Sequence, residues 1–357
     1  MKANLAQLTN YQGELPIAAL KKQFKLNQLV RLSANESSFG PSPQVVQALQ
    51  ATDFSQLNRY PDGSATALRT EIAKLEGINP QQIVFGTGAD ELIELICRVT
   101  LTNQGNMVQV SPTFGEYGIQ AQIEGTELRE IPVNENTGKV EFAKLKAAID
   151  ERTELIWLAN PNNPTGVFED PQAIQTFLRD LPSQTVLVLD EAYIEFVNEA
   201  APSVIKLVAQ FPNLVVLRTL SKAYGLANLR IGYGVASGKM LNALQSIRLP
   251  YNLSNFQIAG GKAALTDQAY VHKVVQVVQQ ERQQWEAFLQ RHLFTFYPSA
   301  ANFMFVKVQN AQRVGDYLLQ NGYQVKYPVQ RDWLRITIGK PADNQAVRNL
   351  LLEATNA

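Results

Sequence analysis

The chain has 357 residues, 45% hydrophobic and 18% charged, a composition typical of a globular enzyme with more than one domain. Its 32 Lys and Arg residues balance 32 Asp and Glu residues, which argues against a nucleic-acid partner. A single cysteine excludes an intrachain disulfide framework, and two histidines without a Cys/His cluster argue against a metal site or a Ser-His-Asp triad.

The N-terminal segment carries no signal-peptide pattern, and no window approaches the roughly 20 apolar residues that a membrane helix needs. We therefore expect a cytoplasmic protein without a membrane partner. Residues 1–30 contain few helix signals and are expected to form an N-terminal arm.

From about residue 80, short apolar runs alternate with longer amphipathic stretches. This alternation predicts an α/β domain with a mostly parallel sheet flanked by helices. The predicted strands are 83–85, 107–110, 155–159, 185–189 and 214–217, and the predicted helices are 89–101 and 141–150.

The pattern changes after Gly238, and a long helical stretch is predicted over about 256–290. Short strands and helices then alternate, which indicates a smaller α+β domain. Its predicted strands are 302–308, 323–326 and 334–338, and its predicted helices are 312–320 and 343–355. The expected division is an arm at 1–30, a large domain at 31–248, and a small C-terminal domain at 249–357 that packs with the N-terminal segment.

In parallel α/β sheets, ligands bind beyond the carboxyl ends of the strands, so the residues that follow each strand are candidates for a site. Gly86-Thr87-Gly88-Ala89-Asp90-Glu91 joins a strand to a helix, and its glycines and free N–H groups are suited to an anion. A plain strand-to-helix turn explains this segment equally well.

Two further strand ends carry polar residues. The run from Asn160 to Gly166 contains two prolines and three asparagines. An asparagine held rigidly in such a loop can donate a hydrogen bond to a ligand oxygen, and a capped loop is the alternative. Asp190 closes an apolar strand, where a carboxylate is costly unless it is paired. A pyridinium N–H is one such partner, with Tyr193 in reach of the ring's phenolic oxygen, and a helix N-cap is the alternative.

The segment Arg218-Thr219-Leu220-Ser221-Lys222 follows the next apolar strand. A partly desolvated lysine can lose its proton and attack a carbonyl carbon, whereas a solvated surface lysine is the common alternative. Thr219 and Ser221 offer hydroxyls, and Arg230 adds a cation suited to phosphate.

Phe114 follows the strand at 107–110 and can stack on a flat ring or pack in the core. Taken together, these strand ends provide an anion site, a ring stacker, a carboxylate for a ring nitrogen and a lysine for an aldehyde. That set matches pyridoxal 5′-phosphate. A nicotinamide cofactor is not indicated, because position 91 of the Gly86/Gly88 turn is Glu where Gly-x-Gly-x-x-Gly requires glycine.

The chain resembles the fold-type-I aminotransferases and, more narrowly, the histidinol-phosphate aminotransferases. The resemblance covers nearly the whole chain, in several motifs in family order and at family spacing. They are Leu32 to Glu36, Asn58 to Gly63, Gly88 to Ile93, Asn160 to Gly166, Asp190 to Phe196, Arg218 to Gly225, Leu229 to Tyr233, Pro250 to Asn252, Ala301 to Phe303 and Leu334 to Gly339.

The resemblance implies that Lys222 carries the cofactor as a Schiff base and moves a proton between the substrate Cα and the cofactor C4′. Asp190 is implied as the partner of the pyridine nitrogen and Tyr193 as the third catalytic residue. The other implied cofactor contacts are Tyr193 and Asn163 at O3′, Phe114 at the ring, and the backbone of Ala89 and Asp90 with Thr219, Ser221 and Arg230 at the phosphate.

Tyr60 is implied to reach the phosphate from a second subunit, so a homodimer with shared sites is expected. Arg335 is implied to hold the anionic end of the substrate, with Tyr11 and Asn35 lining its pocket. The implied reaction is histidinol phosphate plus 2-oxoglutarate giving imidazole-acetol phosphate plus glutamate, a step of histidine biosynthesis.

The chain departs from the family at Lys326, where an arginine is usual. Lysine keeps the charge but loses the planar fork of guanidinium, and Arg331 in the short connection to Leu334 is a possible substitute. An aromatic or broad-range aminotransferase therefore stays open as an alternative. A threonine-phosphate decarboxylase and a non-catalytic protein of the same fold are weaker alternatives.

Overall fold

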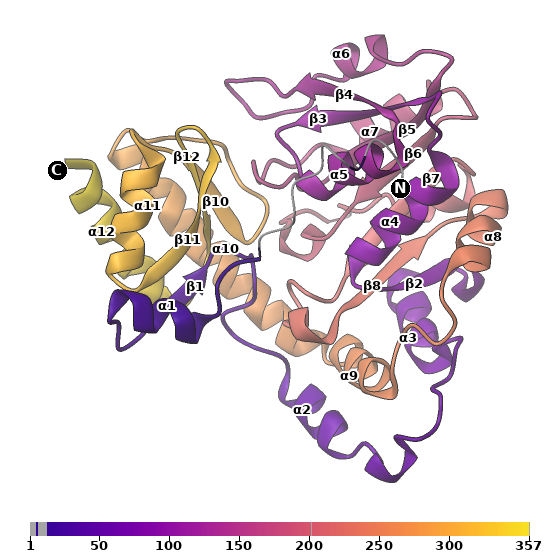
Figure 1. Ribbon diagram of the computed structural model, residues 1–357, viewed down its shortest axis with the longest axis horizontal. Helices are drawn as coiled ribbons and strands as arrows, with labels where there is room; N and C mark the ends of the chain where they lie inside the picture. The colour runs from indigo at the N-terminus through magenta and orange to yellow at the C-terminus, as the bar shows by residue number, and fades with distance from the viewer. Residues whose placement is uncertain (1–4, 6–12, 201, 357) are drawn as a thin grey trace.

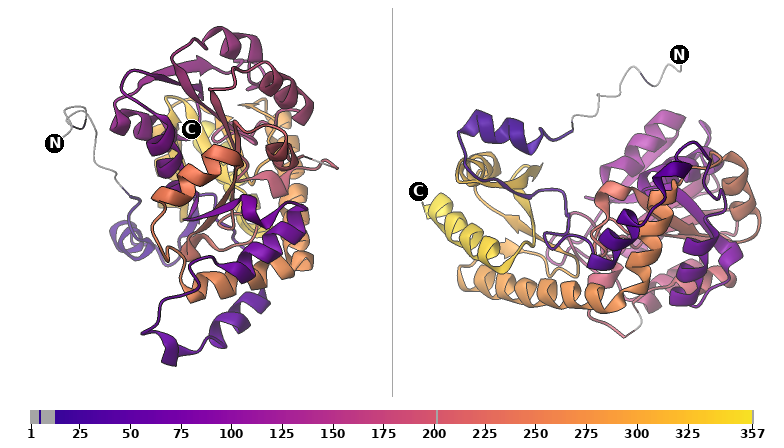
Figure 2. Two further views of the ribbon diagram at one scale, coloured as in Figure 1. Left: turned by 90° about the vertical axis from the view of Figure 1, so that its right-hand side faces the viewer. Right: turned by 90° about the horizontal axis from the view of Figure 1, so that it is seen from below.

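The structure is a computed structural model that describes residues 5, 13–200 and 202–356. Its strands form one sheet of seven and one of five, and the long helix α10 (Gln268–Arg291) runs between the two groups of elements, as Figures 1 and 2 show. Over these residues, no helix is long and apolar enough to cross a membrane.

The seven-stranded sheet has the order β2-β8-β7-β6-β5-β3-β4, and only β8 runs antiparallel to its neighbours. The mostly parallel sheet expected from the sequence is therefore confirmed. The carboxyl ends of its parallel strands meet at one edge. The strands are β2 (Ile83–Thr87), β3 (Asn106–Ser111), β4 (Glu127–Pro132), β5 (Thr153–Ala159), β6 (Val186–Asp190), β7 (Leu214–Thr219) and β8 (Ile231–Val235).

Hydrophobic residues cover both faces of this sheet. Leu187 and Leu189 of β6 lie in one core cluster and Val188 in the other, so a continuous apolar run fills two cores through its alternating side chains. On one face lie α4 (Ala89–Thr100), α5 (Gly115–Glu124) and α8 (Gly238–Ile247). The other cluster includes α2 (Pro43–Gln50), α3 (Thr66–Glu76), α6 (Phe142–Ala147), α7 (Pro171–Arg179) and α9 (Asn255–Thr266). Short 3-10 helices are η2 (Phe54–Gln56), η3 (Pro80–Gln82), η4 (Ile194–Phe196), η5 (Ile205–Ala209) and η6 (Ala227–Leu229).

The five-stranded sheet has the order β1-β11-β12-β10-β9, and only β1 and β11 pair in parallel. The strands and helices expected near 302–338 and 343–355 are present, but β11 continues to Gln330, so residues 331 and 332 form a tight hairpin turn. The elements are β1 (Val30–Leu32), β9 (Thr295–Phe296), β10 (Phe303–Lys307), β11 (Tyr323–Gln330), β12 (Trp333–Thr337), α11 (Ala311–Gln320) and α12 (Pro341–Asn356).

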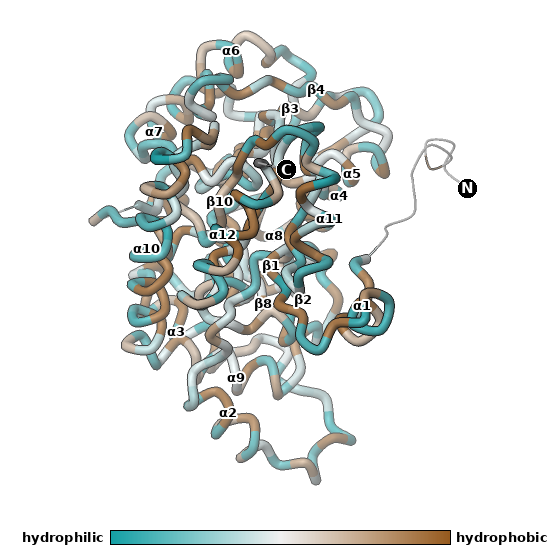
Figure 3. Tube along the Cα trace, turned by 90° about the vertical axis from the view of Figure 1, so that its left-hand side faces the viewer, coloured by the Kyte–Doolittle hydropathy of each residue, from teal (hydrophilic) through white to brown (hydrophobic). Residues whose placement is uncertain are grey.

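The helical stretch predicted over about 256–290 is present, and it consists of two helices, α9 and α10, that meet at Asp267. The Asp267 carboxylate accepts a hydrogen bond from the Tyr270 N–H and caps α10, as aspartate favours at a helix start. Along α10, hydrophobic and hydrophilic positions alternate in Figure 3, and the buried residues recur at helical spacing.

The arm expected at residues 1–30 was predicted to be helix-poor, but α1 (Ile17–Phe24) is a helix whose Leu20 packs with Leu319 of α11. The division into domains remains a prediction. β1 pairs with β11 of the C-terminal sheet, whereas α9 packs on α2 and α3.

Candidate active site

The carboxyl edge of the seven-stranded sheet gathers most of the predicted site residues. Asp190 ends β6 and Thr219 ends β7, whereas Asn163 and Lys222 lie in the segments that follow β5 and β7. Because these strands are neighbours in the sheet, residues far apart in the sequence come together at one edge.

The predicted anion site is built around Gly88, which has φ +81° and precedes α4. A Cβ at Gly88 would lie 2.3 Å from the Arg230 guanidinium, so only glycine lets this cation reach the helix start. Arg230 also donates a 2.7 Å hydrogen bond to Asp90. The N–H groups that begin α4 and the Arg230 cation therefore lie together, as a phosphate requires.

The hydroxyls predicted at this anion site lie on the next strand. The Thr219 hydroxyl lies 3.0 Å from that of Ser221, and Thr219 pairs with Gly232 of β8. A Cβ at Gly232 would come within 2.5 Å of the backbone at Gly88 and Ala89. Glycine in β8 thus lets this strand and the start of α4 approach each other, and such a glycine also interrupts the apolar pattern from which strands were predicted.

Asp190 is buried, and its carboxylate accepts hydrogen bonds from the Tyr117 hydroxyl at 2.6 Å and from the Ala192 N–H at 3.0 Å. Burial raises the pKa of this carboxyl, while these hydrogen bonds and Lys222 oppose the rise. A cationic ring nitrogen is a suitable partner for such a group. Tyr117 was missed by the sequence analysis, although it lies one helical turn after Phe114.

Lys222 is half-buried, and its Nζ donates a 3.1 Å hydrogen bond to the Ala34 carbonyl oxygen. The ammonium lies 5.7 Å from the centre of the Tyr193 ring. The Tyr193 hydroxyl in turn accepts a 2.9 Å hydrogen bond from the Asn35 side-chain amide. Three predicted residues from distant parts of the sequence are thus adjacent.

The predicted substrate arginine, Arg335, joins the two sheets. Its guanidinium donates a 2.6 Å hydrogen bond to the Asn163 side chain and another to the Ser33 carbonyl, while its buried Nε has no partner among the described residues. Burial lowers the pKa of Arg335. An anion would satisfy such a group. Lys326 lies directly opposite Arg335 in the β11–β12 ladder, so both side chains lie on one face of that sheet.

Of the three remaining predicted site residues, Phe114, Tyr60 and Tyr11, the structure describes the first two. Phe114 is half-buried with its ring edge-on to Tyr117, at 5.6 Å between centroids, so it lies beside the Asp190 partner and its stacking role stays a prediction. Tyr60 is 80% exposed and stacks on Tyr251. Tyr11 lies outside the described residues.

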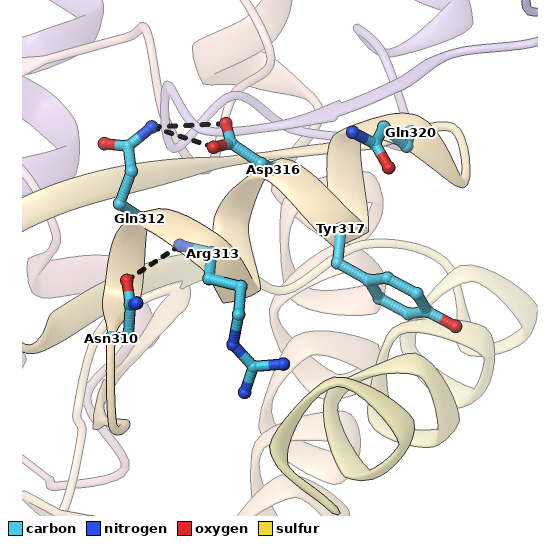
Figure 4. Close-up of a pocket in the computed structure, with 6 residues that line it drawn as sticks. All are labelled: Asn310, Gln312, Arg313, Asp316, Tyr317 and Gln320. Carbon is cyan, nitrogen blue, oxygen red and sulfur yellow. Dashed lines mark hydrogen bonds between the residues drawn. The ribbon is translucent and has the colours of Figure 1, made fainter. Parts of the chain in front are cut away.

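A surface hollow of about 370 Å³ on α11 is separate from this edge (Figure 4). The Gln312 amide bonds the Asp316 carboxylate at 3.1 Å, and Arg313 extends away from that pair. No predicted site residue lines this hollow, and among the described residues that line it, Gln312 and Asp316 are the pair joined by a side-chain hydrogen bond. The described residues also contain no group of three His, Cys, Asp or Glu side chains able to hold a metal ion.

A buried ionic cluster lies behind the site, one residue from Asp190 and from Thr219. The Arg218 guanidinium contacts the carboxylates of Glu191 at 2.8 Å, Glu195 at 3.3 Å and Glu76 at 3.5 Å. One cation faces three acids, and Glu195 Oε2 is buried without a hydrogen-bond partner in the described structure. Burial raises the pKa of Glu195 to about 7, so it carries a proton over the acidic range.

Replacing this acid tests the cluster. Because the folded chain holds the Glu195 proton up to about pH 7, the contribution of Glu195 to wild-type stability falls as pH rises from about 4.5 to 7, by on the order of a few kcal/mol. Glutamine does not titrate, so Glu195→Gln should not show this pH-dependent loss of stability. The free energy of unfolding of the variant should therefore rise relative to that of wild type as the pH increases through this range. Urea unfolding of cofactor-free protein at pH 5 to 8 measures it.

The exposed Glu94, paired with Arg98 on α4, gives a matched control as Glu94→Gln. That variant should follow the wild-type pH dependence, since an exposed pair contributes little. If the unfolding free energies of Glu195→Gln and wild type changed with pH in parallel, Glu195 would not be the group that holds a proton up to about pH 7.

The fold and this site define a pyridoxal-phosphate enzyme of fold type I, because the anion site, the buried carboxylate and the lysine fit that cofactor together. Residues 27–351 match the family model described as aminotransferase class I and II, and the chain belongs to this family. The resemblance to histidinol-phosphate aminotransferases is confirmed by the relatives that follow.

A histidinol-phosphate aminotransferase of Leuconostoc mesenteroides is 51% identical over 356 residues, covering 100% of both chains. That of Bacillus licheniformis is 40% identical over 353 residues, covering 97% of this chain and 96% of the relative. The crystal structure of the Sinorhizobium meliloti enzyme in complex with pyridoxal 5′-phosphate matches with a TM-score of 0.89 and 29% identity, covering 100% of this chain and 97% of that one.

Proposed function

We propose that this chain transfers the amino group of L-histidinol phosphate to 2-oxoglutarate, giving imidazole-acetol phosphate and L-glutamate in histidine biosynthesis, with pyridoxal 5′-phosphate as cofactor. The observation that carries the proposal is the pairing of two cations, Arg335 and Lys326, on one face of the β11–β12 ladder. A phosphate dianion suits two cations better than a single carboxylate does.

Bound pyridoxal phosphate supplies an aldehyde that accepts an amino group and a ring that withdraws electrons from the substrate Cα. The chain supplies the rest. The Lys222 amine anchors the cofactor and takes the proton from the substrate Cα. The Asp190 carboxylate holds a proton on the ring nitrogen, and Tyr193 with Asn163 bonds O3′.

The remaining residues position the two anionic groups. The start of α4 with Arg230, Thr219 and Ser221 holds the cofactor phosphate. Arg335 binds the substrate phosphate in one half-reaction and the 2-oxoglutarate carboxylate in the other, because guanidinium bonds either in bidentate fashion. Asn35 and Phe114 complete the pocket around the substrate and ring.

The half-reaction with each amino donor tests this function. Cofactor-loaded protein is mixed with histidinol phosphate or with phenylalanine, and the absorbance of the bound cofactor is followed. We expect fast conversion by histidinol phosphate and slow conversion by phenylalanine. Comparable rates would favour the broad-range aminotransferase, which remains the second candidate because Lys326 lacks the planar fork with which guanidinium binds phosphate.

Lys326 and Lys307 give a matched pair of variants, since both are exposed lysines of the five-stranded sheet. Lys326→Met should slow the histidinol phosphate reaction roughly tenfold or more, as expected on removing a charged hydrogen bond. It should leave phenylalanine little affected, and Lys307→Met should change neither. Equal losses for both donors would remove Lys326 from the phosphate site.

We further propose a homodimer with shared sites and a cytoplasmic location. Tyr60 stacks on Tyr251 at 4.6 Å between ring centroids and is 80% exposed, so its side chain is accessible to a second copy of the chain. The segment between α2 and α3 lies at the periphery in Figures 1 and 2. Large hydrophobic residues exposed on this segment and on the one preceding α9 are Phe54, Leu57, Tyr60, Leu249 and Tyr251. Such a patch favours association with a second copy.

Mixed subunits test this sharing. Tyr60→Ala and Lys222→Ala chains are each expected to be impaired, but a mixed dimer has one site with both residues intact. Activity should therefore appear on mixing. A monomer of 39.7 kDa in sedimentation, or no gain on mixing, would contradict the proposal.

A further inference from the structure

A chain of buried hydrogen bonds links the five-stranded sheet to Tyr193. Thr337 ends β12 of that sheet, whereas Tyr193 follows β6 of the seven-stranded sheet (Figure 1). Asn35 lies between them, and all three residues are at most 5% exposed. Polar side chains buried to this degree need definite partners.

The Thr337 hydroxyl makes two bonds to Asn35. It accepts a 3.0 Å hydrogen bond from the Asn35 backbone N–H and lies 3.1 Å from the Asn35 Oδ1. Because a hydroxyl has one proton, that proton is free to be donated to Oδ1. The Asn35 amide nitrogen then faces the Tyr193 hydroxyl at 2.9 Å.

The reversed amide would leave a group unsatisfied. With Oδ1 and Nδ2 exchanged, the amide nitrogen would face Thr337, and the Thr337 proton would have no acceptor in a buried position. An unpaired buried donor is costly, so the Thr337 hydroxyl selects one orientation of the Asn35 amide. Asn302 supports the same residue, because its amide donates a 3.1 Å bond to the Asn35 carbonyl, where φ is +54°.

The amide orientation decides what Tyr193 can do. Since Asn35 donates to the Tyr193 oxygen, the phenol proton is not used by Asn35 and remains available to another acceptor. The reversed amide would accept that proton. We propose that Thr337 is a positioning residue that, by orienting the Asn35 amide, keeps the Tyr193 proton directed to the cofactor O3′.

This inference rests on the O3′ role proposed for Tyr193. A hydrogen bond donated to O3′ stabilises the anionic oxygen and so lowers its proton affinity. Losing it should raise the pH midpoint of the absorbance change of the bound cofactor. It should also weaken cofactor binding. Both quantities are measured without turnover.

The test compares four variants by spectral titration and by the cofactor dissociation constant. Tyr193→Phe removes the phenol, and Thr337→Val removes the orienting hydroxyl in a residue of the same shape. Asn35→Asp places an acceptor next to Tyr193, as the reversed amide would, and Thr337→Ser restores the hydroxyl. Thr185→Val is the control, since Thr185, which immediately precedes β6, is a buried threonine whose hydroxyl donates a 2.9 Å hydrogen bond to the Thr153 carbonyl.

We expect the pH midpoint of the cofactor absorbance change to rise by roughly one pH unit, a tenfold change in proton affinity. The same rise is expected in Tyr193→Phe, Thr337→Val and Asn35→Asp. Thr337→Ser and Thr185→Val should match wild type. A midpoint unchanged in Tyr193→Phe overturns the role of Tyr193 itself. A shift in Tyr193→Phe with none in Thr337→Val or Asn35→Asp overturns the positioning role and leaves the proposed function intact. If Thr337→Val does not fold, Thr337→Ala, which also removes the hydroxyl, decides in its place.

Discussion

Lys222→Ala should reduce turnover by on the order of 10⁴-fold or more, as removal of a covalent catalytic residue does. The variant should nevertheless still bind the cofactor, because the start of α4 and Arg230 are untouched. Borohydride reduction followed by peptide mass analysis measures the covalent link directly. Wild type should retain the cofactor on the peptide that contains Lys222, and the variant should retain none.

An exposed lysine on α8 provides the control. Lys239→Ala should keep both the label and wild-type turnover, since Lys239 is exposed on α8, which follows the end of β8 at the edge of the sheet opposite the site. Retained activity in Lys222→Ala, or a label on another lysine, would overturn the central assignment of this site.

Asp190→Ala should weaken cofactor binding and catalysis together. The carboxylate is buried and bonds the Tyr117 hydroxyl, so the alanine variant loses the charge that a protonated ring nitrogen requires. Loss of one charged hydrogen bond predicts roughly 10- to 100-fold weaker cofactor binding. We expect a larger fall in turnover at saturating cofactor, because the ring then withdraws electrons less well.

Two further variants separate the charge of Asp190 from its volume and from its hydrogen bond with Tyr117. Asp190→Asn keeps the volume but not the charge, and it should behave like Asp190→Ala. Tyr117→Phe keeps the carboxylate and removes one neutral donor, so its loss should be the smallest of the three. Unchanged binding and turnover in Asp190→Ala would mean that another group partners the ring nitrogen.

The sequence predicted the parallel part of the large sheet because buried strands are continuous apolar runs, as in β6 and β7. It missed β4, whose residues are half-exposed at the sheet edge, and β8, whose two glycines interrupt the apolar pattern. Local sequence propensity predicts a loop for both segments. β4 is a strand because it pairs with β3 at the edge of the sheet, and β8 contains glycine because Gly232 approaches Gly88 closely.

The sequence by itself determined which residues can form the site. Asp190, Thr219 and Lys222 each stand at or after a strand end, and parallel strands bring such ends to one edge whatever the details of packing. The roles of these residues remain predictions, but their proximity follows from local pattern and chain order.

Only the tertiary structure decided which side chains bond one another. Tyr117 is 73 residues from the Asp190 that it bonds, and Thr337 is 302 residues from Asn35. Nothing in the local pattern specifies such pairs, since hydrogen-bond partners are chosen only when packed elements exclude water and each buried donor must find an acceptor. Local periodicity thus placed the strand ends, and packing assigned their partners.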